Sequence, residues 1–187
     1  MDKPPTVVWF YGLAGAGKST AASIASEYFG GPVIDGEAVR RIFCPELGYS
    51  AVDRLEVSKN IARSLATMLN AKLYPDGTRV IWVSSMAAHE EQRLAVERML
   101  YGREILWVLI DTQLPICMDR RKSGLAYSSD SAVRAVDPRP SPHLVLRGDH
   151  GSLGEMINDW LPALQELLQH PHTSSGNLAQ KGQSSFG

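Results

Sequence analysis

Residues 12–20 read GLAGAGKST and match the pattern G-x4-G-K-[ST], in which glycines, a lysine and a hydroxyl residue surround a phosphate group. A short apolar run, TVVWFY at residues 6–11, precedes this stretch and predicts a buried strand. Small and apolar residues at helical spacing follow over residues 18–29. A strand, a glycine-rich turn and a helix in this order form the context in which the pattern binds a nucleoside triphosphate.

The residue types of this loop explain how it binds phosphate. Glycines let successive backbone N–H groups converge on one oxyanion, and the N-terminus of the following helix adds the positive end of its dipole. Lys18 is predicted to reach the β- and γ-phosphates of ATP, Ser19 to ligate Mg²⁺, and Thr20 to bond the α-phosphate. We therefore predict ATP and Mg²⁺ as ligands, with the nucleotide held by Gly12, Ala14, Gly15, Ala16, Gly17, Lys18, Ser19 and Thr20.

Further apolar runs alternate with helical patterns along the chain. Strands are predicted at residues 32–35, 79–84, 104–110 and 144–146, and helices at 53–73, 90–101, 113–121 and 153–168. Pro162 is expected to kink or restart the last helix. Unbroken apolar strands indicate an α/β fold with a parallel β-sheet and helices on both faces. Trp9, Trp82 and Trp107 fall at equivalent places in three strands and are predicted to pack in the core.

Length and composition set further limits. The chain has 187 residues, 44% of them hydrophobic, which predicts one domain over residues 1–168 and a disordered polar tail over 169–187. A formal net charge of −1 argues against a nucleic-acid partner. No apolar run reaches the roughly 18 residues of a membrane span, and no leader pattern is visible at the start. Cys44 and Cys117 form no metal or redox motif, so we expect a cytoplasmic protein without membrane contact.

The remaining motifs favour a small kinase over other proteins with this loop. The N-K-x-D pattern of GTPases is missing, and the chain is too short for a large ATPase motor. Asp35 follows the second predicted strand, where an acid orients the acceptor hydroxyl, accepts its proton or holds Mg²⁺ through water. A helix N-cap is a second reading of Asp35, compatible with the first. Arg40 is placed to grip an anionic acceptor, with an ordinary solvated charge as the alternative.

The C-terminal third adds a lid and a last helix to this three-layer P-loop kinase fold. Residues 120–142, rich in Ser, Gly, Asp and Pro, are predicted to form a mobile lid over the site. The lid arginines are candidates for stabilising charge on the transferred phosphoryl group; they are Arg120, Arg121, Arg134 and Arg139. The Leu-rich last helix is expected to dock on the sheet, with a homodimer seam as the alternative.

The sequence resembles the adenylyl-sulfate (APS) kinase family. The matching stretches are GLAGAGKST, IDGEAVR at residues 34–40, LGYSAVDRLEVSKNIA at 47–62, Asp111-Thr112, and the C-x-x-R of residues 117–120. The resemblance implies transfer of the γ-phosphate of ATP to the 3′-hydroxyl of APS, a small anionic acceptor. It implies Lys18 and Asp35 as catalytic residues, Arg40, Arg54 and Asn60 as acceptor ligands, and Arg120 near the ATP adenine.

Several positions depart from the family pattern. The pattern D-R-x-x-N-I-R has its asparagine three residues after the arginine, whereas Asn60 lies six residues after Arg54. The motif F-I-S-P-Y-R is VSSMAA at residues 83–88, where Ser85 takes the place of the serine in the acceptor site. The F-T-G-I motif, whose aromatic ring stacks on the acceptor adenine, has no counterpart. The phosphotransfer half of the site is thus intact and the acceptor half is altered.

Three functions follow from this comparison. The first is an APS kinase. The second is a kinase of the same family with another nucleotide-linked acceptor, such as cytidine diphosphoramidate. The third is a nucleotide-binding module without phosphotransfer, against which the acid at Asp35 argues.

Overall fold

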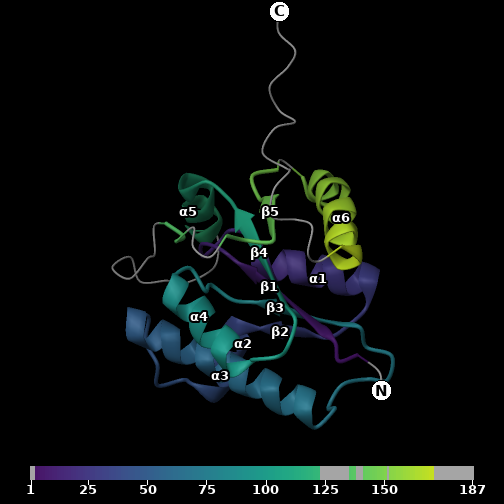
Figure 1. Ribbon diagram of the computed structural model, residues 1–187. Helices are drawn as coiled ribbons and strands as arrows, with labels where there is room; N and C mark the ends of the chain where they lie inside the picture. The colour runs from purple at the N-terminus through teal and green to yellow at the C-terminus, as the bar shows by residue number, and fades with distance from the viewer. Residues whose placement is uncertain (1–2, 123–134, 138–140, 151, 171–187) are drawn as a thin grey trace, which may run out of the picture.

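The computed structural model describes residues 3–122, 135–137, 141–150 and 152–170. Five strands alternate with helices along the chain (Figure 1). In chain order they are β1 (Thr6–Tyr11), α1 (Lys18–Phe29), β2 (Val33–Asp35), α2 (Gly36–Phe43), α3 (Ala51–Asn70), β3 (Val80–Ser84), α4 (Glu90–Met99), β4 (Ile105–Asp111), α5 (Leu114–Lys122), β5 (Leu144–Arg147) and α6 (Leu153–Gln169).

The strands form one parallel sheet in the order β2-β3-β1-β4-β5. Helices α1 and α6 cover one face, and α2, α3 and α4 cover the other (Figure 1). The predicted α/β class, with three layers and a parallel sheet, is therefore confirmed. Since all strands run the same way, their carboxyl ends meet at one edge, which is where a ligand site is expected.

Both faces of the sheet are apolar because each is packed against helices. Along β1, Val8 and Phe10 face the core under α1 and α6, whereas Val7, Trp9 and Tyr11 face the core under α3 and α4. All five side chains are fully buried. This two-sided burial explains why β1 reads as an unbroken apolar run rather than an alternating one.

The three strand tryptophans are core residues, as predicted, but they do not share a face. Trp9 lies opposite Trp107 in the register of β1 and β4, and their ring centroids are 5.2 Å apart. Trp82 lies opposite Val8 instead, so it points to the other side of the sheet, where its ring stacks on Phe10. The prediction of equivalent places is wrong for Trp82, because a shift of one residue in register reverses the face.

Helix boundaries differ from the predictions where local capping decides them. No range was predicted for a helix after Asp35, and the eight residues of α2 form one there. Helix α3 begins two residues earlier than predicted because Ser50 and Asp53 form a capping box. Helix α6 continues across Pro162 and does not restart there. Burial of Trp160, Leu164 and Leu167 against the sheet offsets the one backbone hydrogen bond that proline lacks.

Two predicted regions are described only in part. In the predicted lid, residues 123–134 and 138–140 lie outside the described residues. In the predicted tail, residues 171–187 also lie outside them. Helix α6 reaches Gln169, one residue beyond the predicted domain boundary. Within the described ranges, no helix combines the length and the hydropathy that crossing a membrane requires. A cytoplasmic location stays a prediction.

Candidate active site

The loop between β1 and α1 leaves no room for a side chain at Gly12 and Gly15. Gly12 has φ +143°, and a Cβ atom there would lie 2.6 Å from the carbonyl oxygen of Ile110. Gly15 has φ +84°, and a Cβ atom there would lie 2.5 Å from the carbonyl oxygen of Cys117. Both distances are too short for any side chain. The glycines of the motif therefore let the loop pack tightly against β4 and α5.

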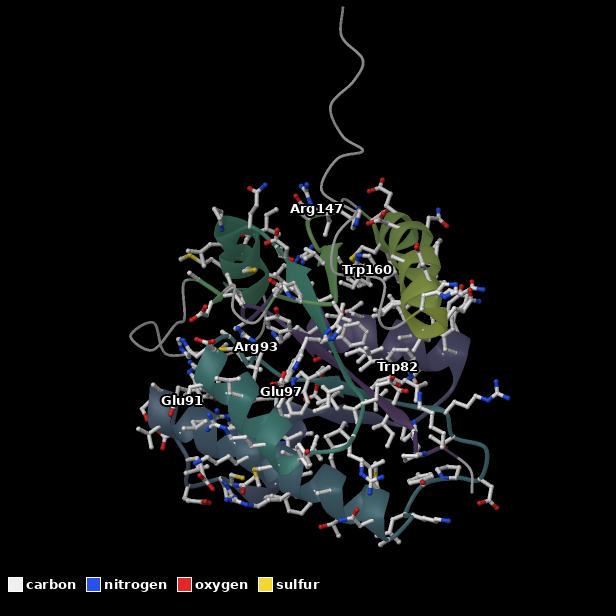
Figure 2. The ribbon with its side chains drawn as sticks, viewed as in Figure 1. Trp82, Glu91, Arg93, Glu97, Arg147 and Trp160 are labelled. Carbon is white, nitrogen blue, oxygen red and sulfur yellow. The ribbon has the colours of Figure 1, made fainter. Side chains whose placement is uncertain are left out.

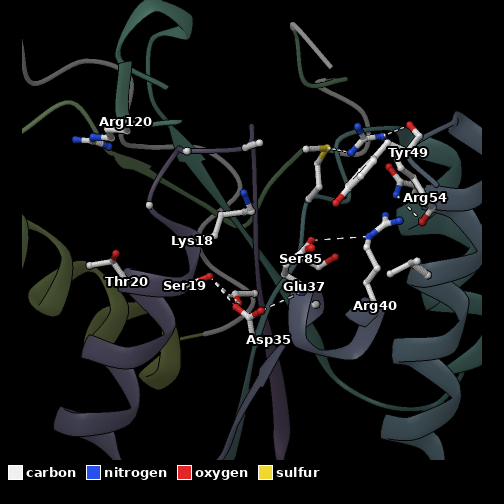
Figure 3. A pocket seen from close by; sticks show the side chains of 18 of the residues that line it. Lys18, Ser19, Thr20, Asp35, Glu37, Arg40, Tyr49, Arg54, Ser85 and Arg120 are labelled. Atoms are coloured by element: carbon white, nitrogen blue, oxygen red, sulfur yellow. Dashed lines mark hydrogen bonds and ion pairs between the residues drawn. The ribbon is translucent and has the colours of Figure 1, made fainter. Parts of the chain in front are cut away.

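The loop ends at the start of α1, beside a cavity of about 420 Å³ (Figure 3). Gly17 is the N-cap of α1, and because glycine has no side chain it does not cap the first turn of the helix. The Lys18 ammonium donates a hydrogen bond of 2.7 Å to the Leu13 carbonyl. Ser19 and Thr20 line the cavity with Lys18, in the arrangement that suits a polyphosphate.

Not every residue of the motif faces this cavity. Ala14, Gly15 and Gly17 line it, whereas Gly12 and Ala16 are absent from its lining. The Gly12 N–H donates to the Met86 carbonyl (3.1 Å) and the Ala16 carbonyl accepts from the buried Thr112 hydroxyl (2.8 Å). These two residues hold the loop in place through hydrogen bonds to neighbouring segments.

Asp35 stands at the carboxyl end of β2 and caps α2, which confirms the N-cap reading, while its part in phosphoryl transfer stays a prediction. Its Oδ1 accepts from the backbone N–H groups of Glu37 and Ala38, each at 3.0 Å. Its Oδ2 accepts from the hydroxyls of Ser19 and Ser84, each at 2.7 Å (Figure 3). The carboxylate is thus held at both oxygens at the edge of the phosphate loop.

These contacts keep Asp35 ionised. Burial raises the pKa of its carboxyl group, but the hydrogen bonds from Ser19 and Ser84, and then those from the Ala38 and Glu37 N–H groups, outweigh that effect. The pKa of Asp35 therefore lies below its ordinary value. Asp35 is a carboxylate at neutral pH.

The donor set beside Lys18 fits Mg²⁺. A serine hydroxyl and a carboxylate lie in hydrogen-bond contact at the phosphate loop, and Mg²⁺ prefers such hard oxygen ligands together with phosphate oxygens and water. Ser19 is the residue that would hold the ion directly, and Asp35 would contact the Ser19 hydroxyl. The role of Ser19 as a ligand of Mg²⁺ stays a prediction.

The far side of the cavity is built around two buried arginines and one aromatic ring. The guanidinium carbons of Arg40 and Arg54 lie 4.5 Å and 5.5 Å from the centroid of the Tyr49 ring. Arg40 also donates to the carbonyls of Leu47 and Gly48, and Arg54 Nε donates to the Tyr49 carbonyl at 2.8 Å. Both arginines line the cavity opposite Lys18 (Figure 3). A patch of buried positive charge on this side suits an anionic acceptor.

The structure brings most of the other predicted site residues into this cavity. Ser85 and Arg120 belong to its lining. Asn60 does not, and its amide donates to the Cys44 sulfur at 3.0 Å. The predicted role of Asn60 in acceptor binding therefore has no geometric support. Arg134, Arg139 and the side chain of Arg121 lie outside the described part of the chain.

Several cavity residues were not assigned to the site from the sequence. Tyr49 stands in the motif LGYS, and its place in this stretch of the family resemblance was the available signal. Val57 lies three residues after Arg54, where the family pattern has asparagine, and Met86 stands where that pattern has proline. Ser84 and Gln92 also line the cavity, and nothing in their spacing pointed to the site.

A parallel α/β fold, a phosphate loop with its lysine, and an adjacent carboxylate together define a P-loop kinase. Comparison with known proteins then places the chain within this class. It belongs to the adenylylsulphate kinase family, whose model matches residues 4–134.

Curated relatives are adenylyl-sulfate kinases of bacteria. The protein of Vibrio cholerae is 31% identical over 178 residues, covering 87% of this chain and 79% of the relative. That of Yersinia pestis is 35% identical over 176 residues, covering 87% of this chain and 78% of the relative. That of Vibrio vulnificus is 34% identical over 129 residues, and here the match spans 66% of this chain and only 59% of the relative's length.

Solved structures share the fold at lower identity. An APS kinase of Mycobacterium tuberculosis, determined with AMPPNP and APS, has a TM-score of 0.70 at 22% identity and covers 88% of this chain and 99% of its own. A gluconokinase of Sinorhizobium meliloti has a TM-score of 0.65 at 19% identity and covers 94% of this chain and all of its own. Kinases of two different acceptors thus share this architecture, so the acceptor has to be argued from the site.

Proposed function

We propose that this protein is an ATP-dependent kinase that phosphorylates the 3′-hydroxyl of adenylyl sulfate. One observation carries the proposal: a single cavity joins the phosphate loop and Asp35 to the buried cations Arg40 and Arg54. The membership of the family and the names of the curated relatives support APS as the acceptor.

In this proposal the loop binds the triphosphate and Lys18 stabilises the charge on the γ-phosphoryl group. Mg²⁺ at Ser19 neutralises phosphate charge when it is bound. The acceptor oxygen forms a bond to the γ-phosphorus while the bond from that phosphorus to the bridging oxygen of ADP breaks. Asp35 orients the acceptor hydroxyl and receives its proton. A strong base is not required, because the transition state of phosphoryl transfer is loose.

The acceptor lies on the opposite side of the cavity. Arg40 and Arg54 are only 9% and 6% exposed, so their charges act on a bound anion with little screening by solvent. They bind the phosphosulfate group and point the acceptor hydroxyl toward Asp35. Arg120, at the start of the predicted lid, contacts the ATP side of the cavity.

The test is a steady-state assay of ADP release with ATP, Mg²⁺ and APS. The proposal expects turnover that depends on APS and saturates with it. Arg54→Met and Arg40→Met should each raise the KM for APS more than tenfold, because each removes one charge-assisted contact. The KM for ATP should stay within about twofold in both variants. ADP release that APS does not accelerate would contradict the proposal.

A second candidate, a different nucleotide-linked acceptor, is favoured by two apolar residues in the acceptor half. Val57 and Met86 line the cavity where the family pattern has asparagine and proline. The same assay with a cytidine diphosphate-linked acceptor distinguishes the two candidates. A kcat/KM for that acceptor above the value for APS would replace the first proposal with the second.

A further inference from the structure

Ser84 is a buried hydroxyl at the site to which the function described so far gives no role. It is the last residue of β3 and is 2% exposed. Its Oγ donates to Asp35 Oδ2 at 2.7 Å and lies 3.4 Å from the Ser19 hydroxyl. The family pattern has isoleucine at this place, so the hydroxyl is a feature of this chain and not of the pattern.

The sheet register explains why this hydroxyl meets Asp35. Ser84 is paired with Asp35 between the parallel strands β2 and β3, at the carboxyl end of both. Paired residues in neighbouring strands direct their side chains to the same face. The backbone of Gly36, the next residue after Asp35, packs closely against Ser84. A Cβ atom on Gly36 would lie 2.9 Å from the Ser84 carbonyl oxygen.

The two hydroxyls on Asp35 Oδ2 differ in what else they contact. Ser19 lies at the exposed start of α1 and is the proposed ligand of Mg²⁺. Ser84 is buried at the inner end of the cavity, and its hydroxyl donates to Asp35 from a strand of the sheet. Meanwhile Oδ1 is fixed by the first turn of α2. Ser84 is therefore the buried partner of Oδ2, and together with the α2 N–H groups on Oδ1 it restrains rotation of the carboxylate about its Cβ–Cγ bond.

We propose that Ser84 is a positioning residue for phosphoryl transfer, which acts through Asp35 by holding its Oδ2 at the phosphate loop. This inference depends on the proposed function, in which Asp35 orients the acceptor hydroxyl. A residue that fixes the orientation of a reacting group affects the chemical step more than the binding of substrates. A serine that merely fills a strand end would affect neither.

The discriminating variants are Ser84→Val and Ser84→Thr, which have nearly the same shape and differ in the hydroxyl. A β-branched side chain suits this place, since the family pattern has isoleucine there. Ser84→Val should lower kcat about tenfold and leave the KM for ATP within about twofold, because it loses a hydrogen bond to a charged group. Ser84→Thr should keep kcat within about threefold of the wild type.

Two additions keep the test decisive. Ser84→Ala removes the same hydroxyl without adding bulk. Melting temperatures show which variants are folded. Ser26→Ala removes a hydroxyl that donates to the Gly31 carbonyl at 2.7 Å, far along α1, and should leave kcat unchanged. Equal kcat values for Ser84→Val and Ser84→Thr, or a normal kcat in Ser84→Ala, would overturn the proposal.

A measurement without substrates separates this proposal from the assigned function. Urea unfolding of the unliganded protein measures the free energy of unfolding. The losses caused by Ser84→Ala and Asp35→Ala should not add up in the double variant, because the two side chains form one hydrogen bond with each other. Additive effects would overturn the role of Ser84. If APS is not phosphorylated by the wild type, the proposed function fails, and the same Ser84 variants are then compared by ATP hydrolysis without acceptor. Equal hydrolysis rates in all of them would reject the role of Ser84 separately.

Discussion

At the residue scale, Lys18 is the side chain on which transfer depends most. It is the cation of the phosphate loop, and its proposed partner is the charge that develops on the γ-phosphoryl group. Lys18→Ala should lower kcat/KM by about 10³-fold while the melting temperature changes little. Lys59→Ala, which removes an exposed ion pair with Glu56 on α3, is the control and should leave activity intact. Activity retained in Lys18→Ala would contradict the kinase assignment.

Gly15 offers a second residue-scale prediction with a matched control. Gly15 and Gly77 have similar φ values of +84° and +80°. A Cβ atom added at Gly15 would meet other atoms within 4 Å, whereas one added at Gly77 would meet none. Gly77→Ala should cost about 1–2 kcal/mol from backbone strain alone. Gly15→Ala adds a clash with the Cys117 carbonyl, so its free energy of unfolding should fall further and its ATP affinity should drop. Calorimetric titration with ATP and urea unfolding check both, and equal effects of the two substitutions would be the contrary result.

At the scale of elements, Arg93 joins three segments around the site. It projects from α4 toward the sheet and is fully buried (Figure 2). It donates to the Ala87 carbonyl at 2.6 Å and to the Asp137 carbonyl at 2.8 Å, and its guanidinium lies 4.7 Å from the centroid of the Tyr11 ring. It thus links the end of β1, the loop after β3 and the described residues 135–137.

Removing this link should destabilise the fold. Arg93→Met leaves two buried carbonyls with one partner fewer, and the free energy of unfolding should fall by about 2–4 kcal/mol. Arg98→Met, on the exposed side of the same helix, should change it by less than about 0.5 kcal/mol. Urea unfolding of both variants measures the difference. A loss in Arg93→Met no larger than in Arg98→Met would show that the link contributes nothing.

The predictable elements were those whose own residues determine them. The phosphate loop, the apolar strands and the amphipathic helices could be located from local patterns, because burial on both faces of a sheet leaves a direct signature. The face of Trp82 and the full length of α2 were not predicted. The first depends on the register between strands, and the second on a cap that Asp35 supplies together with packing against α3.

At the scale of the whole molecule, acid should destabilise the protein through its aspartates. The hydrogen bond and ion pair with Arg147 lower the pKa of Asp149 from 3.8 to about 2. Its stabilising effect is therefore complete above pH 3.8 and is lost as the pH falls toward 2. Because the Arg147 side chain is exposed to solvent, which screens the pair, the effect is about 0.5 kcal/mol or less. Asp149→Asn should flatten the fall in unfolding free energy between about pH 4 and pH 2, and an unchanged slope would contradict this.

The site as a whole was predictable in its phosphotransfer half and less so in its acceptor half. Lys18, Ser19 and Asp35 belong to motifs whose spacing determines their geometry. Ser84 joins the site through the register of β2 and β3, which no local pattern reveals, whereas Tyr49 lies in a stretch of the family resemblance. Arg40 was predicted from its place after the second strand and Arg54 from the family resemblance, and the cavity brings the two together around one ring.

The central claim is that phosphate moves from ATP to APS in this cavity, and detecting the product tests it most directly. The purified protein is incubated with ATP, Mg²⁺ and APS, and the acceptor is analysed by phosphorus NMR and mass spectrometry. The account predicts one added phosphate on the 3′-hydroxyl of APS for each ADP released, and product formation about 10³-fold slower with Lys18→Ala. Release of ADP together with inorganic phosphate, and with APS unchanged, would contradict it.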